Sequence, residues 1–459
     1  MISDTRNSGN HNTHYINRIN RLISICKDFR SKCKSISSSN TELEQLLDER
    51  SRALTESTYK LGRIHSELED EMETAKRIQE GLMPKELPEA VNLRATAIYI
   101  PAGKVGGDLY DIIITPRQKI AILIFDVSGH GIPAALITAM AKMLFANAIE
   151  KNDSPAEVFR EVNKQLCNFI KTEQYLTAFL GVIDPIKNTM TYSRAGHVPP
   201  MVYNTKKSVV TKLDSKGFFI GHSALLNIAE YWDNQVQLAP DDKILFYTDG
   251  LTEGCSEEGK LYGAERLKDA LITNGSLDIK FLLDKIVDDQ AKFRQGTPLR
   301  DDFTLLCVEI QDSEYLLTDS GFTREDEPNI MLVYALKDIE KVCSLVLKEL
   351  DRCGYSDKTI KQFKICIFEM LTNAILHGNK GDASKKVVIF YKITQISASM
   401  SVIDQGDGFD YNSIPDPLSP ENRIKDHGRG VFLMRHYFDE IHFNSKGNRI
   451  LGRKYHGGK

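Results

Sequence analysis

The sequence lacks the features by which secreted and membrane-spanning proteins are recognised. None of its eight cysteines forms a CxxC pair, and several lie inside apolar runs such as residues 305–308. This usage predicts reduced thiols in protein cores and a cytoplasmic location. No run approaches the ~18–20 apolar residues that cross a bilayer. Because residues 7–13 are polar, we also expect no signal peptide.

A strong charge of either sign is also missing. Lys and Arg number 59 against 63 Asp and Glu, which gives a net charge of -4 and a pI of about 6.3. This balance gives no electrostatic reason to expect nucleic acid or an anionic membrane as the main partner. The apolar share of 41% is that of a soluble globular protein. A length of 459 residues is too great for one core, so two or three domains are expected.

Residues 1–85 have few β-strand signals and carry apolar residues at a seven-residue spacing. The spaced positions are Leu47, Leu54, Leu61, Leu68, Ala75 and Leu82, with a weaker companion stripe at Leu43, Ile64 and Ile78. This heptad pattern predicts a helix over residues 43–82, roughly 60 Å long at ~1.5 Å per residue. A dimeric coiled coil and a single amphipathic helix lying on the next domain both fit it, and we favour the dimer.

Residues 86–312 alternate short β-like runs with long helical patterns. Strands in two groups, with paired helices between and after them, predict an α/β sandwich. The expected strands are 112–115, 120–126, 178–184, 190–193, 243–248 and 303–310, and the expected helices are 132–150, 155–171 and 277–293.

Residues 313–329 are polar and acidic with little periodicity, which predicts a linker. Residues 330–459 then form a further α/β zone, and the whole chain is therefore expected to be an α/β multidomain protein. In this last zone the expected strands are 330–336, 386–393, 397–404 and 449–455, and the expected helices are 338–353, 359–377 and 431–438.

Four aspartates of the middle zone stand where an apolar strand ends or a tight turn begins: Asp108, Asp126, Asp249 and Asp301. Carboxylate oxygens are the ligands that hard divalent cations prefer. Two such ions about 3.5–4 Å apart activate a water molecule and clamp a phosphoryl group for in-line attack. A single Asp-Gly pair is more often an ordinary turn. The spacing alone therefore leaves a metal site and a set of turns both open.

The order of these motifs resembles a known family. The motifs are Gly-Gly-Asp at 106–108, Asp-Val-Ser-Gly-His-Gly at 126–131, Thr-Asp-Gly at 248–250 and Asp-Asp-Phe-Thr at 301–304. Together with 75–84 and 195–200, they resemble the metal-dependent PPM (phosphatase 2C-like) family. Within it, they are most similar to the SpoIIE/RsbU-type bacterial serine phosphatases that regulate sigma factors. The resemblance covers residues 75–310 and implies an α-β-β-α phosphatase sandwich.

The resemblance implies a site for two Mn²⁺ or Mg²⁺ ions. Asp126 is then expected to bridge both ions, with the Val127 carbonyl as a further ligand. Asp249 and Asp301 are expected to hold the first ion. Asp108 is expected to reach the site directly or through water.

The resemblance is less specific at other positions. Asp302 stands where eukaryotic members often have Asn, so its place among the metal ligands is less defined. His197 is expected to be structural or to face the substrate rather than to bind metal. Residues 75–79 resemble the family's switch helix, and the phosphate-binding arginine of eukaryotic relatives has no clear counterpart here.

The last zone carries a second group of polar motifs. Glu369, Asn373 and His377 share one face of an expected helix, which on its own is typical of a solvated surface. Two glycine-rich turns follow, at 404–409 after a strand and at 427–430 before an apolar helix. The second turn places backbone N–H groups at a helix N-terminus, which suits phosphate oxygens.

This ordered set resembles the GHKL (HATPase_c) ATPases, and specifically the RsbW-type anti-sigma-factor serine kinases, over residues 330–459. The resemblance implies a two-layer α/β domain that binds ATP with Mg²⁺. Asn373 would then ligate Mg²⁺, Glu369 would act as general base, and Asp404 would bind the adenine amino group. The lid and phosphate cradle would be shaped by Gly406, Gly408, Gly428 and Gly430.

Two classes of function fit these motifs. The first is a bifunctional partner-switching regulator, whose phosphatase domain acts on a phosphoserine of a STAS-domain anti-sigma-factor antagonist. Its C-terminal domain would phosphorylate that antagonist or sequester its partner, with a sigma factor among the candidates. The second is an ATP-gated anti-sigma factor or scaffold that binds its partner without phosphorylating it. A histidine kinase is disfavoured, because His65 precedes the phosphatase zone rather than the ATPase zone.

Overall fold

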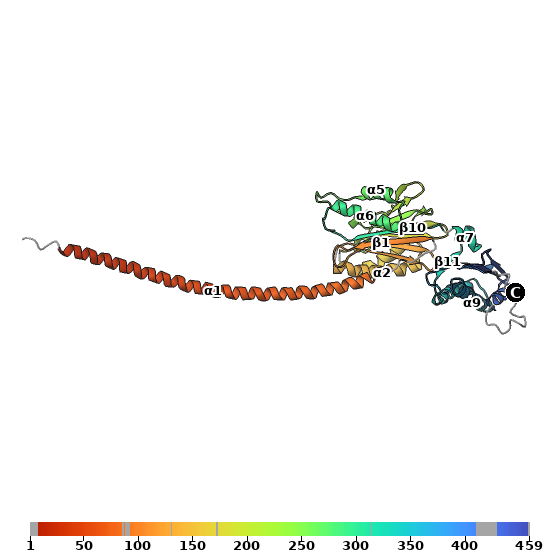
Figure 1. The fold of residues 1–459 in the computed structure, drawn as a ribbon, viewed down its shortest axis with the longest axis horizontal. Coiled ribbons are helices and arrows are strands. Elements are labelled where there is room, and N and C mark those ends of the chain that lie inside the picture. Colours follow the sequence, from red (N-terminus) through yellow and green to blue (C-terminus); the bar gives the residue numbers. More distant parts are fainter. Residues whose placement is uncertain are drawn as a thin grey trace, which may run out of the picture. The chain divides into compact units, whose positions relative to one another are not determined.

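A computed structural model describes residues 8–84, 87, 92–129, 131–170, 173–312, 314–409 and 429–457. They form a long N-terminal helix, a middle domain with two sheets and a C-terminal domain with one sheet (Figure 1). The chain divides into two units, the first ending at Thr74 and the second beginning at Ala75. This confirms the expected fold class.

Helix α1 spans Ser8–Glu80 without interruption. It begins well before residue 43, where the heptad pattern was first recognised. Ion pairs between side chains four residues apart, such as Arg52–Asp48 at 2.7 Å and Lys60–Glu56 at 2.7 Å, stabilise the helix. Leu47, Leu54, Leu61 and Leu68 of the heptad stripe are exposed, as Leu54 at 70% illustrates, so this apolar face is uncovered in the single chain, whereas Leu82 packs on the middle-domain core.

The middle domain contains two five-stranded antiparallel sheets, in the orders β1-β10-β9-β6-β7 and β2-β3-β4-β5-β8. The strands are β1 (Leu93–Ile100), β2 (Leu109–Ile114), β3 (Ile120–Val127), β4 (Leu176–Asp184), β5 (Thr189–Ala195), β6 (Met201–Asn204), β7 (Val209–Lys212), β8 (Asn234–Gln237), β9 (Lys243–Tyr247) and β10 (Phe303–Ile310). An apolar layer that includes Ile122, Phe179 and Phe246 packs between the sheets. The sheets thus form the centre of the expected sandwich.

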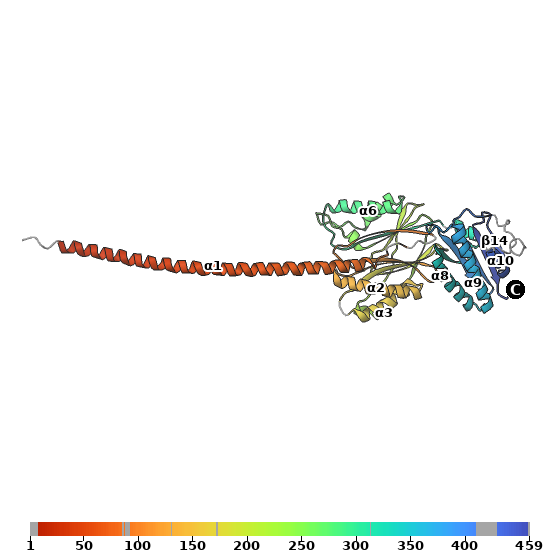
Figure 2. The ribbon, with the colours of Figure 1, turned by 60° about the horizontal axis from the view of Figure 1, so that its bottom comes forward.

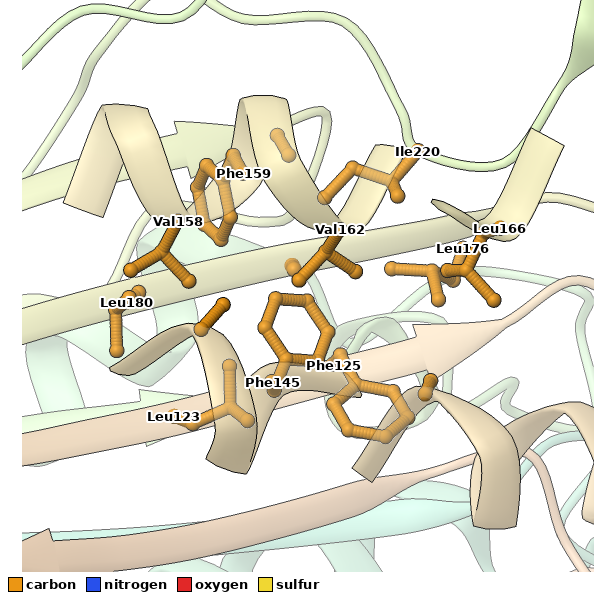
Figure 3. Packing of buried hydrophobic residues seen from close by; sticks show 14 of the residues in the cluster. Leu123, Phe125, Phe145, Val158, Phe159, Val162, Leu166, Leu176, Leu180 and Ile220 are labelled. Atoms are coloured by element: carbon orange, nitrogen blue, oxygen red, sulfur yellow. The ribbon is translucent and has the colours of Figure 1, made fainter. Parts of the chain in front are cut away.

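Helices cover the outer face of each sheet. Helices α2 (Ile132–Lys151) and α3 (Pro155–Phe169) pack on the sheet of β2, and α5 (Ala264–Asn274) and α6 (Ile279–Arg294) pack on the sheet of β1. Under α2 and α3, the ring of Phe145 is fully buried (Figure 3). Its centroid lies 5.5 Å from that of the Phe125 ring and 6.1 Å from that of the Phe159 ring. The predicted α-β-β-α order is therefore confirmed.

Helix α2 corrects one expectation from the sequence. Its 20 residues, with a mean hydropathy of 1.6, are long and apolar enough to cross a membrane, although no such stretch was expected. It is the one helix of this kind in the described part of the chain. Ala141, Phe145 and Ala148 are fully buried between α3 and the sheet, which is the packing of a core helix in a folded domain.

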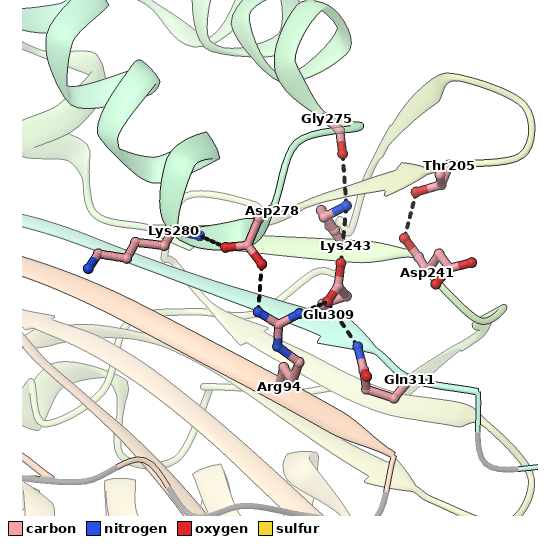
Figure 4. A network of polar contacts seen from close by, with 9 residues as sticks. All are labelled: Arg94, Thr205, Asp241, Lys243, Gly275, Asp278, Lys280, Glu309 and Gln311. Carbon is pink, nitrogen blue, oxygen red and sulfur yellow. Dashed lines mark hydrogen bonds and ion pairs between the residues drawn. The ribbon is translucent and has the colours of Figure 1, made fainter.

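A charged network ties β1 and β9 to the start of α6 (Figure 4). Arg94 pairs with Asp278, the N-cap residue of α6, at 2.6 Å and with Glu309 at 3.3 Å. The buried Lys243 ammonium lies 3.2 Å from Glu309 and donates to the Gly275 carbonyl at 2.9 Å. Because Lys243 has both a counter-charge and an acceptor, its burial is compensated.

The C-terminal domain has one antiparallel sheet in the order β11-β12-β13-β15-β14, with helices on one face (Figure 2). The strands are β11 (Asn329–Val333), β12 (Val387–Ile393), β13 (Ser397–Ile403), β14 (Glu440–Phe443) and β15 (Arg449–Tyr455), and the helices are α8 (Ile339–Arg352), α9 (Asp357–Thr372) and α10 (Arg429–Tyr437). This is the two-layer arrangement that the sequence predicted.

The segment expected to be a linker is folded onto the C-terminal sheet. It forms helix α7 (Glu314–Ser320) and a short 3-10 turn, and its Leu317 and Phe322 pack against Phe390 and Leu451 on the face opposite α9. Ile186 of the middle domain joins the same apolar cluster. Helix α7 was not expected because two anchoring apolar residues are too few to create a periodic pattern, and the linker between the domains stays a prediction.

Candidate functional site

The middle-domain aspartates gather at one end of the two sheets. Asp126 lies in β3, Asp249 begins the short helix α4 (Asp249–Thr252) after β9, and Asp301 precedes β10. Burial, followed by the charges of Asp249, Asp301 and Asp302, raises the pKa of Asp126 to about 7. Burial and Asp301 likewise raise the pKa of Asp249 to about 6. The fold therefore brings together carboxylates that are far apart in the sequence.

Asp108 is held at the base of this cluster by two hydroxyl groups. Its Oδ2 accepts hydrogen bonds from the hydroxyls of Thr248 at 2.7 Å and Thr304 at 2.6 Å, and the residue is 1% exposed. Burial and the neighbouring Asp126 hold the pKa of Asp108 well above its usual range. Nothing in the sequence indicated this role for either threonine, although Thr248 and Thr304 both belong to the aspartate motifs.

Asp302 fixes the loop that leads to Asp108. Its carboxylate accepts hydrogen bonds from the backbone N–H groups of Ala102 at 2.8 Å and Gly107 at 2.6 Å, and the residue is buried. Both carboxylate oxygens are thus engaged by the chain itself. A role for Asp302 as a metal ligand stays a prediction, and its observed contacts are those of a residue that shapes the loop.

The two glycines before Asp108 permit close backbone packing. A Cβ at Gly106 would lie 1.9 Å from Asp302 Oδ2, and a Cβ at Gly107 would lie 2.5 Å from the Val127 carbonyl oxygen. Real Cβ atoms do not approach other atoms so closely, so glycine is required at both positions. This packing brings the loop against the end of β3.

The donor chemistry of the cluster fits hard divalent cations. Every candidate ligand is an oxygen, and the carboxylates raise one another's pKa because their negative charges are close together. Within the described residues, no three Asp, Glu, His or Cys side chains are grouped tightly enough to form a metal-binding set by themselves. Cations that neutralise the charge would also have to draw these side chains together.

The last turn of α1 contacts the same loop. The Gln79 side chain, 6% exposed, donates from Nε2 to the Gly106 carbonyl at 2.5 Å and accepts from the Gly106 N–H at 2.9 Å. Lys142 of α2 donates to the Leu82 carbonyl and pairs with Asp111 at 3.2 Å. The segment that resembles a switch helix is therefore joined to the loop that carries Asp108.

His197 is buried away from the carboxylates. Its Nε2 lies 3.1 Å from the Tyr247 carbonyl and its Nδ1 lies 2.9 Å from the Thr177 hydroxyl. Because a carbonyl only accepts, Nε2 carries the proton and Nδ1 accepts from Thr177. Burial lowers the pKa of His197 to about 4. These contacts agree with the structural role that the sequence suggested.

We expect His197 to destabilise the middle domain as the pH drops from 6.5 towards about 4, whereas Asp126 and Asp249, whose pKa values are raised to about 7 and about 6, act in the opposite direction over the same window. In this window the unfolded state protonates His197 while the folded state does not, which removes up to ~3 kcal/mol. Urea denaturation at several pH values, followed through the fluorescence of the single tryptophan, Trp232, measures how the free energy of unfolding depends on pH. Compared with the wild type, the variant His197→Asn should gain more stability, or lose less, as the pH falls through this window, and equal pH dependences would contradict the assignment.

A cavity of about 420 Å³ lies in the C-terminal domain between α9 and the sheet. Helix α9 ends at Thr372 and continues as one π-helical turn, Asn373–Gly378, where the sequence predicted a regular helix to His377. Asn373, Ala374, His377 and Gly378 of this turn line the cavity. Such π turns are frequent at functional sites, and sequence periodicity does not reveal them.

Of the predicted nucleotide residues, Asn373, Asp404 and Gly408 line this cavity, whereas Glu369, Gly406 and Gly430 do not. Asp404 follows β13 and lines it, and burial raises the pKa of its carboxyl group. A Cβ at Gly378 would lie 2.3 Å from the Asp404 carboxyl carbon, and a Cβ at Gly430 would lie 2.2 Å from Glu369 Oε2. Of the predicted glycines, Gly406, Gly408 and Gly430 are described, whereas Gly428 lies outside the described residues.

Asp404 is held in place by Asn448, a residue that none of the sequence motifs contains. The Asn448 side chain donates to the Asp404 carbonyl at 2.8 Å, and the Asp404 N–H donates to the Asn448 carbonyl at 3.0 Å. The Asn444 side-chain amide donates to Asn448 Oδ1 at 2.9 Å and to Asp319 of α7 at 3.1 Å. A continuous set of hydrogen bonds therefore connects α7 with the floor of the cavity.

Comparison with protein families gives one match for each domain. The family described as Stage II sporulation protein E (SpoIIE) matches residues 116–311. The family described as histidine kinase-like ATPase domain matches residues 333–454. These ranges contain most of the middle domain and nearly all of the C-terminal domain.

Characterised relatives resemble the two domains separately. Phosphoserine phosphatase RsbU of Bacillus subtilis is 29% identical over 245 residues, which are 53% of this chain and 71% of the relative. Serine-protein kinase RsbW of the same species is 30% identical over 115 residues, 24% of this chain and 72% of the kinase. Protein IcfG of Synechocystis sp. is 26% identical over 52% of this chain, which spans only 41% of IcfG.

Solved structures also resemble the chain. The SiaA-PP2C domain of Pseudomonas aeruginosa has a TM-score of 0.48 and 23% identity, covering 53% of this chain and 98% of that domain. The RsbU and RsbW domains of Rv1364c from Mycobacterium tuberculosis have a TM-score of 0.44 and 19% identity, covering 82% of this chain and 95% of that structure.

Proposed function

The chain joins a SpoIIE-type PPM phosphatase domain to a C-terminal ATPase domain that belongs to the RsbW serine-kinase family, and from this premise we propose a cytoplasmic partner-switching regulator. Its middle domain removes phosphate from a phosphoserine on a STAS-domain anti-sigma-factor antagonist. Its C-terminal domain uses ATP to phosphorylate the same antagonist, or sequesters a sigma factor. The observation that carries the phosphatase activity is the cluster of buried carboxylates around Asp126.

The proposed phosphatase site holds two Mn²⁺ or Mg²⁺ ions. When bound, they supply an activated water molecule and a clamp for the phosphoryl oxygens. Asp126 would hold both ions, with the Val127 carbonyl as a further ligand, and Asp249 and Asp301 would hold the first. Asp108 would reach the ions directly or through water, and the hydroxyls of Thr248 and Thr304 hold its carboxylate in place.

The proposed nucleotide site places ATP in the cavity beside the π turn. Asp404, which Asn448 holds in place, would accept a hydrogen bond from the adenine amino group. Asn373 would bind Mg²⁺, and Glu369, which adjoins the start of α10 at Gly430, would accept the proton of the attacking serine hydroxyl. The backbone N–H groups at the start of α10 suit the phosphates.

Hydrolysis of p-nitrophenyl phosphate by the full chain, with and without Mn²⁺, tests the phosphatase function. We expect turnover that depends on the added metal. The alternative, an ATP-gated scaffold or anti-sigma protein, predicts ATP binding without phosphate transfer to the STAS partner. Incubation of the full chain with radiolabelled ATP and an unphosphorylated STAS protein separates these outcomes.

We expect Gln79→Ala to lower phosphatase turnover by about tenfold or more. The variant loses both hydrogen bonds to Gly106, each worth about 1 kcal/mol, and releases the loop that positions Asp108. Initial rates with p-nitrophenyl phosphate and Mn²⁺ measure the effect. Arg77→Ala, an exposed change in the same turn, is the matched control and should retain wild-type rates. Equal rates for both variants would contradict a role for the Gln79 contact.

A further inference from the structure

Helix α1 carries its seven-residue spacing far beyond the stretch first recognised. Counting back from Leu47 in steps of seven gives Asn40, Cys33, Cys26 and Ile19, all within the helix. A second series, three residues after the first, consists of Leu22, Phe29, Ile36 and Leu43. These two series are the a and d positions of a heptad repeat, and every d position from residue 22 to residue 43 holds an apolar residue.

The side chains of this N-terminal stretch are exposed in the single chain. The exposed fractions are 53% for Ile19, 56% for Leu22, 69% for Phe29 and 62% for Ile36. Cys26 and Cys33 are also exposed, which corrects the expectation that the thiols lie in protein cores. A stripe of this length on one helix face indicates a surface that another helix covers.

The residue types in the stripe specify the partner. Asn40 occupies an a position, and a buried Asn is tolerated there when it faces another Asn, which occurs in a parallel, in-register pair of identical helices. By contrast, the d positions farther along hold Arg50, Ser57 and Glu71, which weakens the stripe there. The strongest section of the seam is therefore residues 19–47, which contains both exposed cysteines.

We propose that α1 pairs with a second copy of this chain as a parallel, in-register coiled coil in which Cys26 faces Cys26 and Cys33 faces Cys33. This deepens the homodimer of the proposed function by assigning its direction, its register and a pair of interchain thiol sites. In an antiparallel pair, Cys26 of one helix could face Cys33 of the other only if the pair were centred between residues 29 and 30. Because α1 begins at Ser8, the part of the helix beyond residue 51 would then have no partner helix.

The facing thiols can form an interchain disulfide with oxidised glutathione. The thiolate of one cysteine attacks the glutathione disulfide and releases one reduced glutathione. The thiolate of its counterpart then attacks the mixed disulfide and releases the second. The two cysteines lose two electrons and two protons, and glutathione gains the electrons. Formation needs Cα atoms within about 7 Å, a condition that facing seam positions can meet and outer positions cannot.

Cross-linking of the full chain tests the arrangement. The variants Cys26→Ser and Cys33→Ser each retain one seam thiol, and we expect both to form a covalent dimer with oxidised glutathione on a non-reducing gel. The double variant should remain uncross-linked. Adding Ser24→Cys to the double variant places a thiol on the outer face of the same helix, and we expect at least tenfold less cross-linked dimer.

The outcomes separate the proposals. Cross-linking of the wild type but of neither single variant indicates antiparallel pairing and overturns the inference. Equal cross-linking of the Ser24→Cys chain means collision in solution and also overturns it. Light scattering of the reduced chain reports the mass independently of the cross-link. A dimer mass without single-variant cross-links retains the homodimer but rejects this register, and a monomer or tetramer mass rejects the two-stranded seam.

Discussion

Replacing Asp126 with alanine is expected to reduce phosphatase turnover about 10³-fold or more. Asp126 lies at the centre of the carboxylate cluster, where Asp249, Asp301 and Asp302 all act on its pKa. Its removal would take away the proposed bridge between the two ions, and with it the activated water. Turnover of a phosphorylated STAS protein with Mn²⁺ is the direct measurement, and calorimetry should show weaker Mn²⁺ binding.

Two controls make this result specific. Asp269→Ala removes an exposed aspartate of α5, outside the cluster, and should leave turnover unchanged. ATP binding by the Asp126→Ala chain should equal that of the wild type, because the nucleotide cavity lies in the other domain. Full turnover by Asp126→Ala would end the proposed metal mechanism, whereas a loss of ATP binding would point to misfolding.

Asn373→Ala is expected to weaken binding of ATP with Mg²⁺ by about 100-fold. Asn373 begins the π turn and lines the cavity near Glu369 and Gly430, so its amide oxygen is the proposed protein ligand of Mg²⁺. Calorimetric titration measures the affinity. Without Mg²⁺, the variant and the wild type should bind ATP with similar affinity, since the lost contact is to the metal.

The same turn offers a matched control for this experiment. Leu376 is 43% exposed and does not line the cavity, so Leu376→Ala should bind ATP as the wild type does. Equal affinity of Asn373→Ala and wild type in the presence of Mg²⁺ would contradict the assignment. Hydrolysis of p-nitrophenyl phosphate should be unchanged in both variants, which verifies that the middle domain is intact.

Much of the fold could be predicted because buried strands and amphipathic helices place apolar residues at regular spacings in the sequence. The bounds expected for β10 and β15 agree with the structure, since both are apolar runs with clear ends. The weakly buried β7 and β8 were missed, because a strand with three exposed residues in four shows no alternation of apolar and polar side chains. Helix α7 was missed for a related reason, as it is held by few apolar contacts.

The candidate sites were predictable only where a motif is local. The aspartates stand out because each lies next to the end or the start of an apolar strand or adjoins a glycine. The threonines that hold Asp108 lie 140 and 196 residues away from it in the sequence, and Gln79 acts on a loop 27 residues away. No local pattern contains such pairings, because they arise only when the two sheets bring their ends together.

Helix α7 determines where the molecule can be divided. It covers Phe390 and Leu451 on the open face of the C-terminal sheet, and its Asp319 holds Asn444 beneath the nucleotide cavity. A fragment cut at residue 330 would expose that face to water and leave the Asn444 amide without its carboxylate. A fragment that starts at 314 keeps both, so the working boundary between phosphatase and ATPase lies before this helix rather than after it.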